Sequence, residues 1–437
     1  MTNILLRARK DPFDVVSPEE TLVRNLIAQN AGNLIFSTAA YRILETAGTT
    51  VTADRFAIEK RDAGRINERH DAYVIPLANA FRLSFEPVLI RMTQLIERLT
   101  IPVVVLGVGA QANLSYDTRR LKRMEPSVRA FVTAVLERGP SIGVRGELTH
   151  DYLRGLGFRD VEVIGCPSLF LNGASVHVEK RRPVLDRESR VAINVSPYVA
   201  SMGPVVAHHV ERYPDLTYIA QDLDTLEMLL WGEVGADVDP ADPRPIHLGH
   251  PLFRDDKVRF FTDPAPWLDF LATRDFSFGT RIHGNIAAII AGTPAFVLAH
   301  DSRTLELARY FEIPHRPMPR NEPALDAADL YAEADYGPLN RGHAARLATF
   351  VAYLDRHRLD HVFRSPPVEP AFAARLATTV FPPPVTVRSR STPHGLAGRM
   401  MRLRRRVTRW LRHPRVRRIR TEIARRGQRP PEPPATD

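Results

Sequence analysis

The 437-residue chain has a single cysteine and no long run of apolar residues, and each absence excludes a class of protein. Cys166 alone cannot form an internal disulfide, and it cannot supply the thiolates of a cysteine-rich zinc site. No segment approaches the roughly 18 to 20 uninterrupted apolar residues of a membrane-spanning helix. The opening residues, MTNILLRARKDPFDVV, also lack the apolar core of a secretory signal. We therefore expect a cytoplasmic protein.

The positive charge of the chain is concentrated at one end. The net charge is +10, but 14 arginines and only three acidic residues follow residue 398, so this segment carries +11 and the remainder about −1. Within 399–429 apolar residues recur at helical spacing, beginning with Met400, Leu403, Val407, Trp410 and Leu411. An apolar stripe surrounded by arginines suits an anionic membrane surface, with Trp410 at the interface. A protein partner or a solvated tail is an alternative, and nucleic acid is the least favoured, because nucleic-acid arms need no apolar stripe.

The rest of the chain alternates short apolar runs with helical patterns, which is typical of βα units around parallel sheets. The expected strands lie at 72–76, 101–109, 141–145 and 161–165, and then at 191–196, 216–221, 258–262, 276–279 and 295–299. Two such series predict an α/β protein with two Rossmann-like, doubly wound domains that face each other across a cleft. The expected boundaries are 1–175 and 188–365 for the domains, 366–398 for a Pro-rich linker and 399–429 for the basic tail.

The most informative segment is FSFGTRIHGNIAAIIAGTPAFVLAHD, residues 276–301. Its strand ends at Gly279 and a helix of small residues follows, so that Arg281 and His283 lie in the turn between them. This edge of a parallel sheet forms the ligand crevice, and a helix N-terminus next to an arginine suits a carboxylate or phosphate. Gly284 would let the backbone approach a ligand closely. The structural alternative is that Arg281 pairs with an acid and His283 caps the helix.

The next strand brings further polar residues to the same edge of the sheet. His300 and Asp301 follow that strand directly, and Arg303 and Glu306 lie in the first turn of the next helix. They are candidates for the same site. The alternative is that Asp301 is the N-cap of this helix and that Glu306 complements its dipole.

These residues carry a family resemblance. The segment GTRIHGNIAAIIAGTPAFVLAHDSRTLELARYFEIP resembles the C-terminal motif of the polysaccharide pyruvyl transferase family, with Gly-x-Arg-x-His-Gly, a helix of small residues, Gly-x-Pro and Asp-x-Arg-x-x-Glu-Leu. SIGVRGELTHDYLRGLGFRDVEVIGCPSLFL resembles the middle segment of the family, and VAINVSP the start of its second half. The resemblance covers about residues 30–320. Cys166 stands where many members have an aspartate before a proline.

Members of this family transfer a pyruvyl group from phosphoenolpyruvate to a sugar as a cyclic ketal. Their fold is similar to the GT-B architecture of two Rossmann-like domains found in glycosyltransferases. The resemblance therefore implies a GT-B-like transferase that acts on a cell-surface polysaccharide or a glycolipid precursor and releases phosphate. Its implied partners are phosphoenolpyruvate, as co-substrate, and a glycan acceptor that a lipid could carry.

Phosphoenolpyruvate carries about three negative charges, so its site requires several cations. Arg281 is the first candidate, followed by Arg145 and Arg303, with Gly284 and Asn285 at the helix N-terminus. Arg145 has a structural alternative as an arginine of a domain-interface ion pair. No metal is expected, because the neighbouring histidines of the chain lack a matching acidic cluster, and no cofactor is expected beside the co-substrate.

Ketal formation also requires a general acid and a base. His283 is the first candidate, either for proton transfer or as a cation that holds the leaving phosphate. Asp301 and Glu306 are the candidate bases for a sugar hydroxyl. The weaker substrate-binding candidates, for which tight turns are an equal explanation at the glycines, are Asn194, Ser196, Gly107, Gly109 and His300.

Two other functions remain open on the sequence. One is a glycosyltransferase of the same architecture that uses a nucleotide sugar, in which Arg281 would bind the diphosphate and Glu306 the ribose. The other is a non-catalytic, membrane-associated glycan-binding protein. In each case the basic tail would hold the protein at the inner face of a membrane, as a peripheral protein.

Overall fold

The computed structural model describes residues 1–232, 238–318, 325–364 and 370–389, together with the single positions 400, 403 and 407. Apart from those three positions, the predicted amphipathic tail at 399–429 lies outside the described residues. None of the helices within the described ranges has the length and hydropathy of a membrane span.

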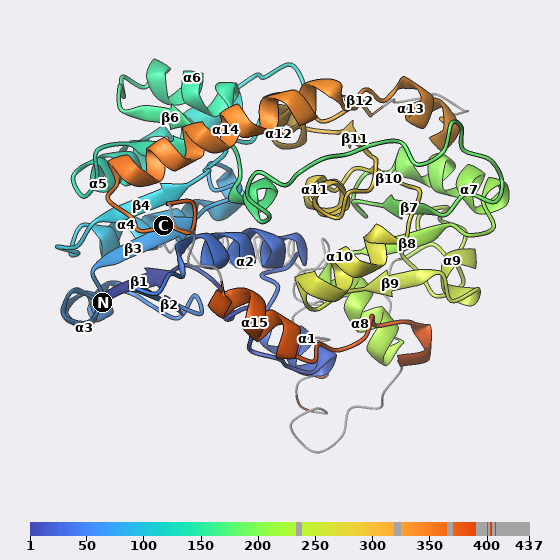
Figure 1. Cartoon of the computed structure of the whole chain (residues 1–437), viewed down its shortest axis with the longest axis horizontal. Coiled ribbons are helices and arrows are strands. Elements are labelled where there is room, and N and C mark those ends of the chain that lie inside the picture. The colour runs from blue at the N-terminus through green and yellow to red at the C-terminus, as the bar shows by residue number, and fades with distance from the viewer. Residues whose placement is uncertain are drawn as a thin grey trace, which may run out of the picture.

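Two halves, each built around a parallel sheet, make up the molecule (Figure 1). The strands of the N-terminal half are β1 (Thr2–Leu6), β2 (Thr49–Ala53), β3 (Ala72–Pro76), β4 (Val103–Leu106), β5 (Ile142–Val144) and β6 (Val161–Val163). Those of the C-terminal half are β7 (Val191–Asn194), β8 (Thr217–Ala220), β9 (Val258–Phe260), β10 (Phe276–Gly279), β11 (Ala295–Ala299) and β12 (His315–Pro317).

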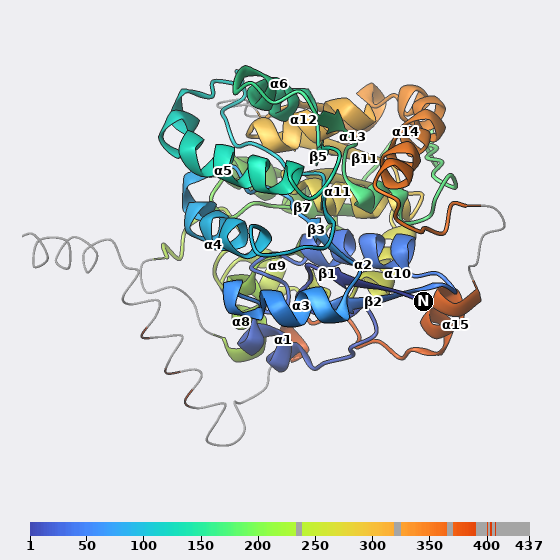
Figure 2. The ribbon, with the colours of Figure 1, turned by 90° about the vertical axis from the view of Figure 1, so that its left-hand side faces the viewer.

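Helices cover both faces of the two sheets. Those of the N-terminal half are α1 (Pro18–Arg24), α2 (Gly32–Leu44), α3 (Ala63–Arg69), α4 (Glu86–Ile96), α5 (Glu125–Leu136) and α6 (Glu147–Gly155), of which α3, α4 and α5 face the viewer in Figure 2. The later helices are α7 (Met202–Arg212), α8 (Leu223–Trp231), α9 (Pro251–Arg254), α10 (Pro264–Ala272), α11 (Ile282–Ile290), α12 (Ser302–Phe311), α13 (Ala327–Glu333), α14 (Gly337–Arg356) and α15 (Pro370–Thr378). Short 3₁₀ helices lie at Lys60–Asp62, Leu83–Phe85, Arg119–Met124, Pro167–Phe170 and Val387–Ser389.

The order of the strands fixes where ligands can bind. The C-terminal sheet has the order β12-β11-β10-β7-β8-β9, which is the doubly wound Rossmann order and reverses between β7 and β10. The N-terminal sheet has the order β2-β1-β3-β4, with the pair β5-β6 joined beside β4 through a parallel bridge from Val108 to Val144. It reverses between β1 and β3. Each reversal opens a crevice at the carboxyl ends of the strands.

The two halves share a continuous apolar core. Ile35 and Phe36 of α2 and Ile286 of α11 belong to one cluster of buried residues that extends through both halves. A buried ion pair between Lys10, after β1, and Asp263, before α10, also links them. The halves are therefore packed against each other, and α2 and α11 lie side by side at the centre of the molecule (Figure 1).

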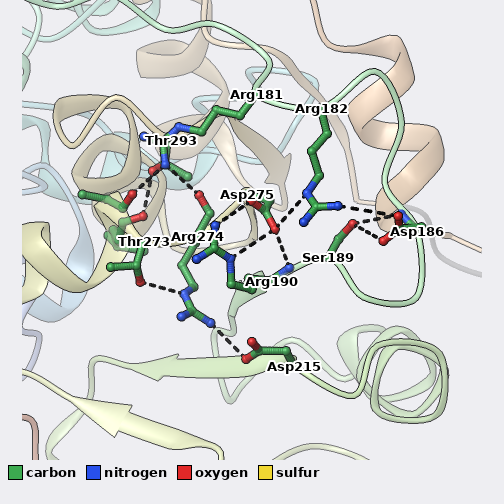
Figure 3. Close-up of polar contacts among 12 residues, drawn as sticks. Arg181, Arg182, Asp186, Ser189, Arg190, Asp215, Thr273, Arg274, Asp275 and Thr293 are labelled. Atoms are coloured by element: carbon green, nitrogen blue, oxygen red, sulfur yellow. Dashed lines mark hydrogen bonds and ion pairs between the residues drawn. The ribbon is translucent and has the colours of Figure 1, made fainter.

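The connection between the halves is fastened to the C-terminal half by arginines (Figure 3). Arg181 donates hydrogen bonds to the carbonyls of Ala272 and Gly292, at 2.6 and 3.1 Å, where α10 and α11 end. These carbonyls have no partner within their own helices, so the guanidinium group caps both. Arg182 and Arg190 both contact the buried Asp275 carboxylate.

The segment 366–398, which we expected to be an extended Pro-rich linker, is partly folded. Helix α15 forms at residues 370–378, where the sequence PAFAARLAT is rich in helix formers, and Phe372 packs edge-on against Phe13 at 4.8 Å. The chain then returns to the C-terminal half, where Val385 exchanges backbone hydrogen bonds with Phe260 at 2.8 and 3.0 Å. Within the described residues 370–389, α15 and the 3₁₀ helix at Val387–Ser389 thus depart from the expected extended conformation.

Candidate active site

A cavity of about 440 Å³ lies between the two halves, at the strand-order reversal of the C-terminal sheet. Its volume is within the range of small-molecule sites. Four arginines line it and no aspartate or glutamate does. The charged and polar side chains in its wall include Arg82, Arg145, Ser196, Gln221, Arg281, His283, His300 and Arg303. The cavity is therefore suited to an anion.

The turn from β10 to α11 is held by a pair of asparagines. Asn194 accepts a hydrogen bond from the backbone N–H of Arg281 at 2.8 Å and donates one to Asn285 at 2.9 Å. Asn285 in turn donates to the carbonyl of Gly279 at 3.0 Å. Neither asparagine lines the cavity, in contrast to our expectation that both bind substrate. The hydrogen bonds of their side-chain amides position Arg281 instead.

Gly284 is also small for a packing reason, and not because a ligand approaches its backbone. A Cβ atom at this position would lie 2.6 Å from Nε2 of Gln221 and 3.0 Å from Cγ of Asn194. The small residue is thus required because the strand ends of β7 and β8 press against the first turn of α11.

Arg281 is the N-cap residue of α11 and its side chain faces the cavity. Nε donates to the carbonyl of Val195 at 3.3 Å, and Nη2 lies 3.8 Å from the carboxylate of Asp222. The guanidinium group also lies over the ring of Tyr198, 5.8 Å from its centroid. These contacts hold the cation beside the orphan N–H groups at the start of α11, where an anion is stabilised.

Arg145 is almost completely buried, with 2% of its surface exposed. Nε donates to the carbonyl of Gly107 at 3.2 Å, whereas Nη2 has no partner among the described residues. A Cβ atom on Gly109 would lie 2.6 Å from Cδ of Arg145, and Gly107 has φ +69° with Gly165 O only 2.4 Å from its would-be Cβ. Both glycines, which we expected near a substrate, therefore make room for the chain around Arg145 and do not line the cavity.

Asp301 is the N-cap of α12, which is the structural alternative that the sequence left open. Its carboxylate accepts hydrogen bonds from the N–H groups of Arg303 and Thr304, at 3.1 and 3.2 Å, as the N-cap of α12. It also accepts from Nε of Arg303 at 2.6 Å, which orients that guanidinium group in the cavity wall. Burial opposes ionisation, but Arg303 and these hydrogen bonds hold the pKa of Asp301 below its usual value. The carboxylate of Asp301 is occupied by these hydrogen bonds and lies outside the cavity lining, so it does not fit the role of base.

Glu306 lies behind the cavity and joins the two halves. It accepts hydrogen bonds from the backbone N–H and the hydroxyl of Thr149 in α6, at 2.8 and 3.1 Å. Burial raises the pKa of this carboxyl group to about 7. Since Glu306 does not reach the cavity, its contacts indicate an interface residue and not a base for a sugar hydroxyl.

His283 lines the cavity and is 9% exposed. Burial, and then the nearby Arg145, lower the pKa of the imidazole to about 3, so the ring is neutral near pH 7. Nε2 lies 3.6 Å from Sγ of Cys166, a thiol whose pKa is raised by burial. A neutral imidazole does not carry the positive charge that holding a phosphate as a cation requires.

Several polar atoms in the wall have no hydrogen-bond partner within the described part of the chain. They are Oε1 and Nε2 of Gln221, Oγ of Ser196 and Nδ1 of His300. Buried polar groups are normally paired, so these atoms are available to a ligand. Ser196 and His300 of this wall were predicted from the sequence. Gln221, Tyr198 and Arg82 were missed. Gln221 could have been found, because it follows a strand directly, as the residues near Arg281 do.

Among the described residues no group of three or more histidine, cysteine, aspartate or glutamate side chains is arranged as metal ligands. The model of the family described as "Polysaccharide pyruvyl transferase" matches residues 30–302, which is more than half of the chain. The chain belongs to the polysaccharide pyruvyl transferase family. As a member, it is a transferase with a pyruvyl donor and a glycan acceptor. No curated protein matches the chain.

Solved structures with a similar arrangement of elements include sugar-nucleotide epimerases and glycosyltransferases. The MnaA–UDP complex of S. aureus is 12% identical, covers 82% of this chain and 98% of its own, and has a TM-score of 0.43. A putative UDP-N-acetylglucosamine 2-epimerase of Listeria monocytogenes is 10% identical over 87% and 98%, with a TM-score of 0.38. The glycosyltransferase SnogD of Streptomyces nogalater is 14% identical over 86% and 99%, with a TM-score of 0.31. The strand orders of its two sheets give the pyruvyl transferase the expected α/β fold of two Rossmann-like halves.

Proposed function

We propose that this pyruvyl transferase uses phosphoenolpyruvate as its donor and forms a ketal on a sugar of a cell-surface polysaccharide or glycolipid precursor, with release of phosphate. The observation that carries the proposal is the wall of the cavity, whose lining contains four arginines and no aspartate or glutamate. A donor with a carboxylate and a phosphate supplies about three negative charges, which is the complement of such a wall.

The roles of the residues follow from their contacts. Arg281 and the N-terminus of α11 hold one anionic group of the donor, and Arg145 and Arg303 hold the other. Nη2 of Arg145 is the strongest of these candidates by geometry, because it is buried without a partner among the described residues. Gln221 and Ser196, with their unpaired polar atoms, orient the donor or the sugar by hydrogen bonds.

His283 is the proton carrier in this proposal. Protonation of the methylene carbon, which becomes the methyl group of the ketal, makes the central carbon of the donor electrophilic, and the oxygen of a sugar hydroxyl bonds to it. The neutral imidazole accepts the proton of that hydroxyl as the bond forms and passes a proton to the methylene carbon, so that the ring is neutral again at the end of the step. A second hydroxyl of the same sugar displaces phosphate from the central carbon, and its proton leaves with the phosphate.

The test uses phosphoenolpyruvate labelled with ¹⁴C in the pyruvyl group and a glycan extract of the source organism as acceptor. Label should enter the glycan with release of an equal amount of phosphate. His283→Gln should lower the rate by about 10²- to 10⁴-fold, and Arg281→Gln should raise the KM for phosphoenolpyruvate by about tenfold or more. Arg61→Gln, which removes the charge of an arginine that is 80% exposed, is the control. Full activity of His283→Gln would disprove the role of proton carrier.

We also propose that the 399–429 segment places the enzyme at the inner face of a membrane, near a lipid-linked acceptor. The sequence pattern of that segment alone supports this. The full chain should sediment with anionic vesicles, and a chain that ends at residue 398 should not. Equal sedimentation of both would refute it.

A further inference from the structure

A second, smaller cavity of about 130 Å³ lies at the strand-order reversal of the N-terminal sheet. Its wall contains Arg7 and Arg9, directly after β1, and the segment that follows β3. The same topological rule that places the large cavity beside β7 and β10 also places a ligand crevice here. Arg82 lines both cavities, so the two are neighbours. We call the smaller one the N-terminal arginine pocket, after Arg7, Arg9 and Arg82.

The pocket concentrates positive charge without a counter-charge in its wall. Its lining contains these three arginines and no aspartate or glutamate. The guanidinium groups of Arg7 and Arg9 lie against the ring of Phe56, at 3.8 and 4.6 Å from its centroid. Nε of Arg9 is buried and has no hydrogen-bond partner in the described part of the chain. Stacking on one ring fixes the two cations in place but leaves their N–H groups free to bind.

One carboxylate outside the lining of the pocket acts on this cluster. Asp54 attracts both Arg7 and Arg9, and its oxygens also accept hydrogen bonds from the N–H of Phe56 and the hydroxyl of Tyr73, both at 2.8 Å. Burial and the repulsion of Arg7 lower the pKa of Arg9, which means that its charged form is destabilised. Like charges held together in a half-buried cavity are costly unless an anion binds between them.

We propose that the N-terminal arginine pocket binds a phosphate or diphosphate group carried by the glycan acceptor. The proposal rests on the proposed function, which assigns the donor anion to the C-terminal side of the large cavity. The volume of the pocket is below the roughly 300 Å³ at which sites for whole ligands begin, so it suits one group of a larger molecule. Because Arg82 belongs to both walls, a sugar attached to that phosphate extends directly into the large cavity.

Titration calorimetry of the full chain tests this with inorganic pyrophosphate as the probe. Arg9→Gln and Arg7→Gln should each weaken pyrophosphate binding by at least about tenfold, and Arg61→Gln should not. Arg281→Gln should retain this binding while it loses phosphoenolpyruvate. Two further arms identify the carrier: glucose 1-phosphate for a soluble acceptor, and phosphatidylcholine vesicles with undecaprenyl phosphate for a lipid-linked one. Loss of either by Arg9→Gln supports the pocket.

The outcomes separate this inference from the proposed function. If the wild-type chain does not bind phosphoenolpyruvate but Arg9→Gln still weakens pyrophosphate binding, the proposed donor is wrong and the pocket stands. If Arg9→Gln and Arg7→Gln bind pyrophosphate, glucose 1-phosphate and the vesicles as the wild type does, the pocket is overturned. Unchanged thermal midpoints of both variants show that they are folded, and an unchanged KM for phosphoenolpyruvate shows that the large cavity is intact.

Discussion

At the scale of single residues, the surroundings of His283 set the protonation of the site, because burial and then the charge of Arg145 lower the pKa of its imidazole. The thiol is neutral because burial raises its pKa, so it offers no negative charge to an imidazolium 3.6 Å away. Arg145 adds a repulsive positive charge. His283 is therefore neutral near pH 7, which is the form that the proposed function assigns to it. An aspartate in place of Cys166 would favour the charged ring instead.

Cys166→Asp should accordingly raise the pKa of His283 by at least about one pH unit, because a carboxylate at this distance stabilises the imidazolium. The measurement is an NMR titration of the His283 ring, assigned by its loss in His283→Gln. Cys166→Ser, which adds no charge, is the control and should leave the pKa low. A ring that titrates at the same pH in Cys166→Asp as in the wild type would show that a carboxylate at position 166 does not stabilise the imidazolium.

At the scale of elements, the site depends on two helices that meet at their N-termini. A Cβ atom on Gly32, the first residue of α2, would lie only 2.6 Å from Cβ of His283 in α11. This contact is between backbone-anchored atoms, so it cannot be relieved by turning a side chain. The absence of a side chain at position 32 thus allows α2 to approach His283.

Gly32→Ala should destabilise the protein by about 1 to 3 kcal/mol, as overpacking does, and should lower kcat because His283 is displaced. Gly64→Ala is the matched control, since Gly64 also lies in a helix and nothing is within 4 Å of its would-be Cβ. It should be neutral or stabilising by up to about 1 kcal/mol. Equal effects of the two substitutions on urea unfolding and on kcat would contradict the packing argument.

The sequence predicts these elements unevenly, for physical reasons. Each of the nine expected strands contains a strand of the structure, because buried parallel strands read as continuous apolar runs. Strands β1, β2 and β12 were not predicted: β2 is threonine-rich and β12 is the polar triplet HRP at a sheet edge. Arg281 and His283 were placed at the cavity by their motif.

The remaining errors concern the direction of side chains and not their position along the chain. Asp301 and Glu306 do lie beside the site, but a cap and an interface hydrogen bond consume their carboxylates. An acidic residue at the start of a helix is consistent both with an N-cap and with a catalytic base, so the sequence does not separate the two roles. Arg82 was missed because it reaches the cavity from a loop without a motif, and only the packing of the two halves brings it there.

At the scale of the whole molecule, buried charges cross the interface between the halves. Glu306 is 2% exposed, and its carboxyl group contacts Thr149 in the other half. The side chains of Lys10 and Asp263, which also pair across the interface, are 4% and 0% exposed. Such groups make the packing of the halves dependent on protonation. Of these groups, Glu306 titrates near physiological pH, because burial raises the pKa of its carboxyl group to about 7.

Glu306→Gln should remove this dependence. An unfolded glutamate has a pKa near 4.3, so between about pH 4.3 and 7 the folded wild type binds a proton that the unfolded chain does not. Stability therefore falls as the pH rises through this window and stays lower above it. The variant should exceed the wild type by about 2 to 3 kcal/mol near pH 8 and match it near pH 5, as measured by urea unfolding. Glu68→Gln, at an exposed position, is the control and should change the stability neither near pH 5 nor near pH 8. If the stability of the wild type does not change between about pH 4.3 and 7, the Glu306 carboxyl group is already ionised inside the interface.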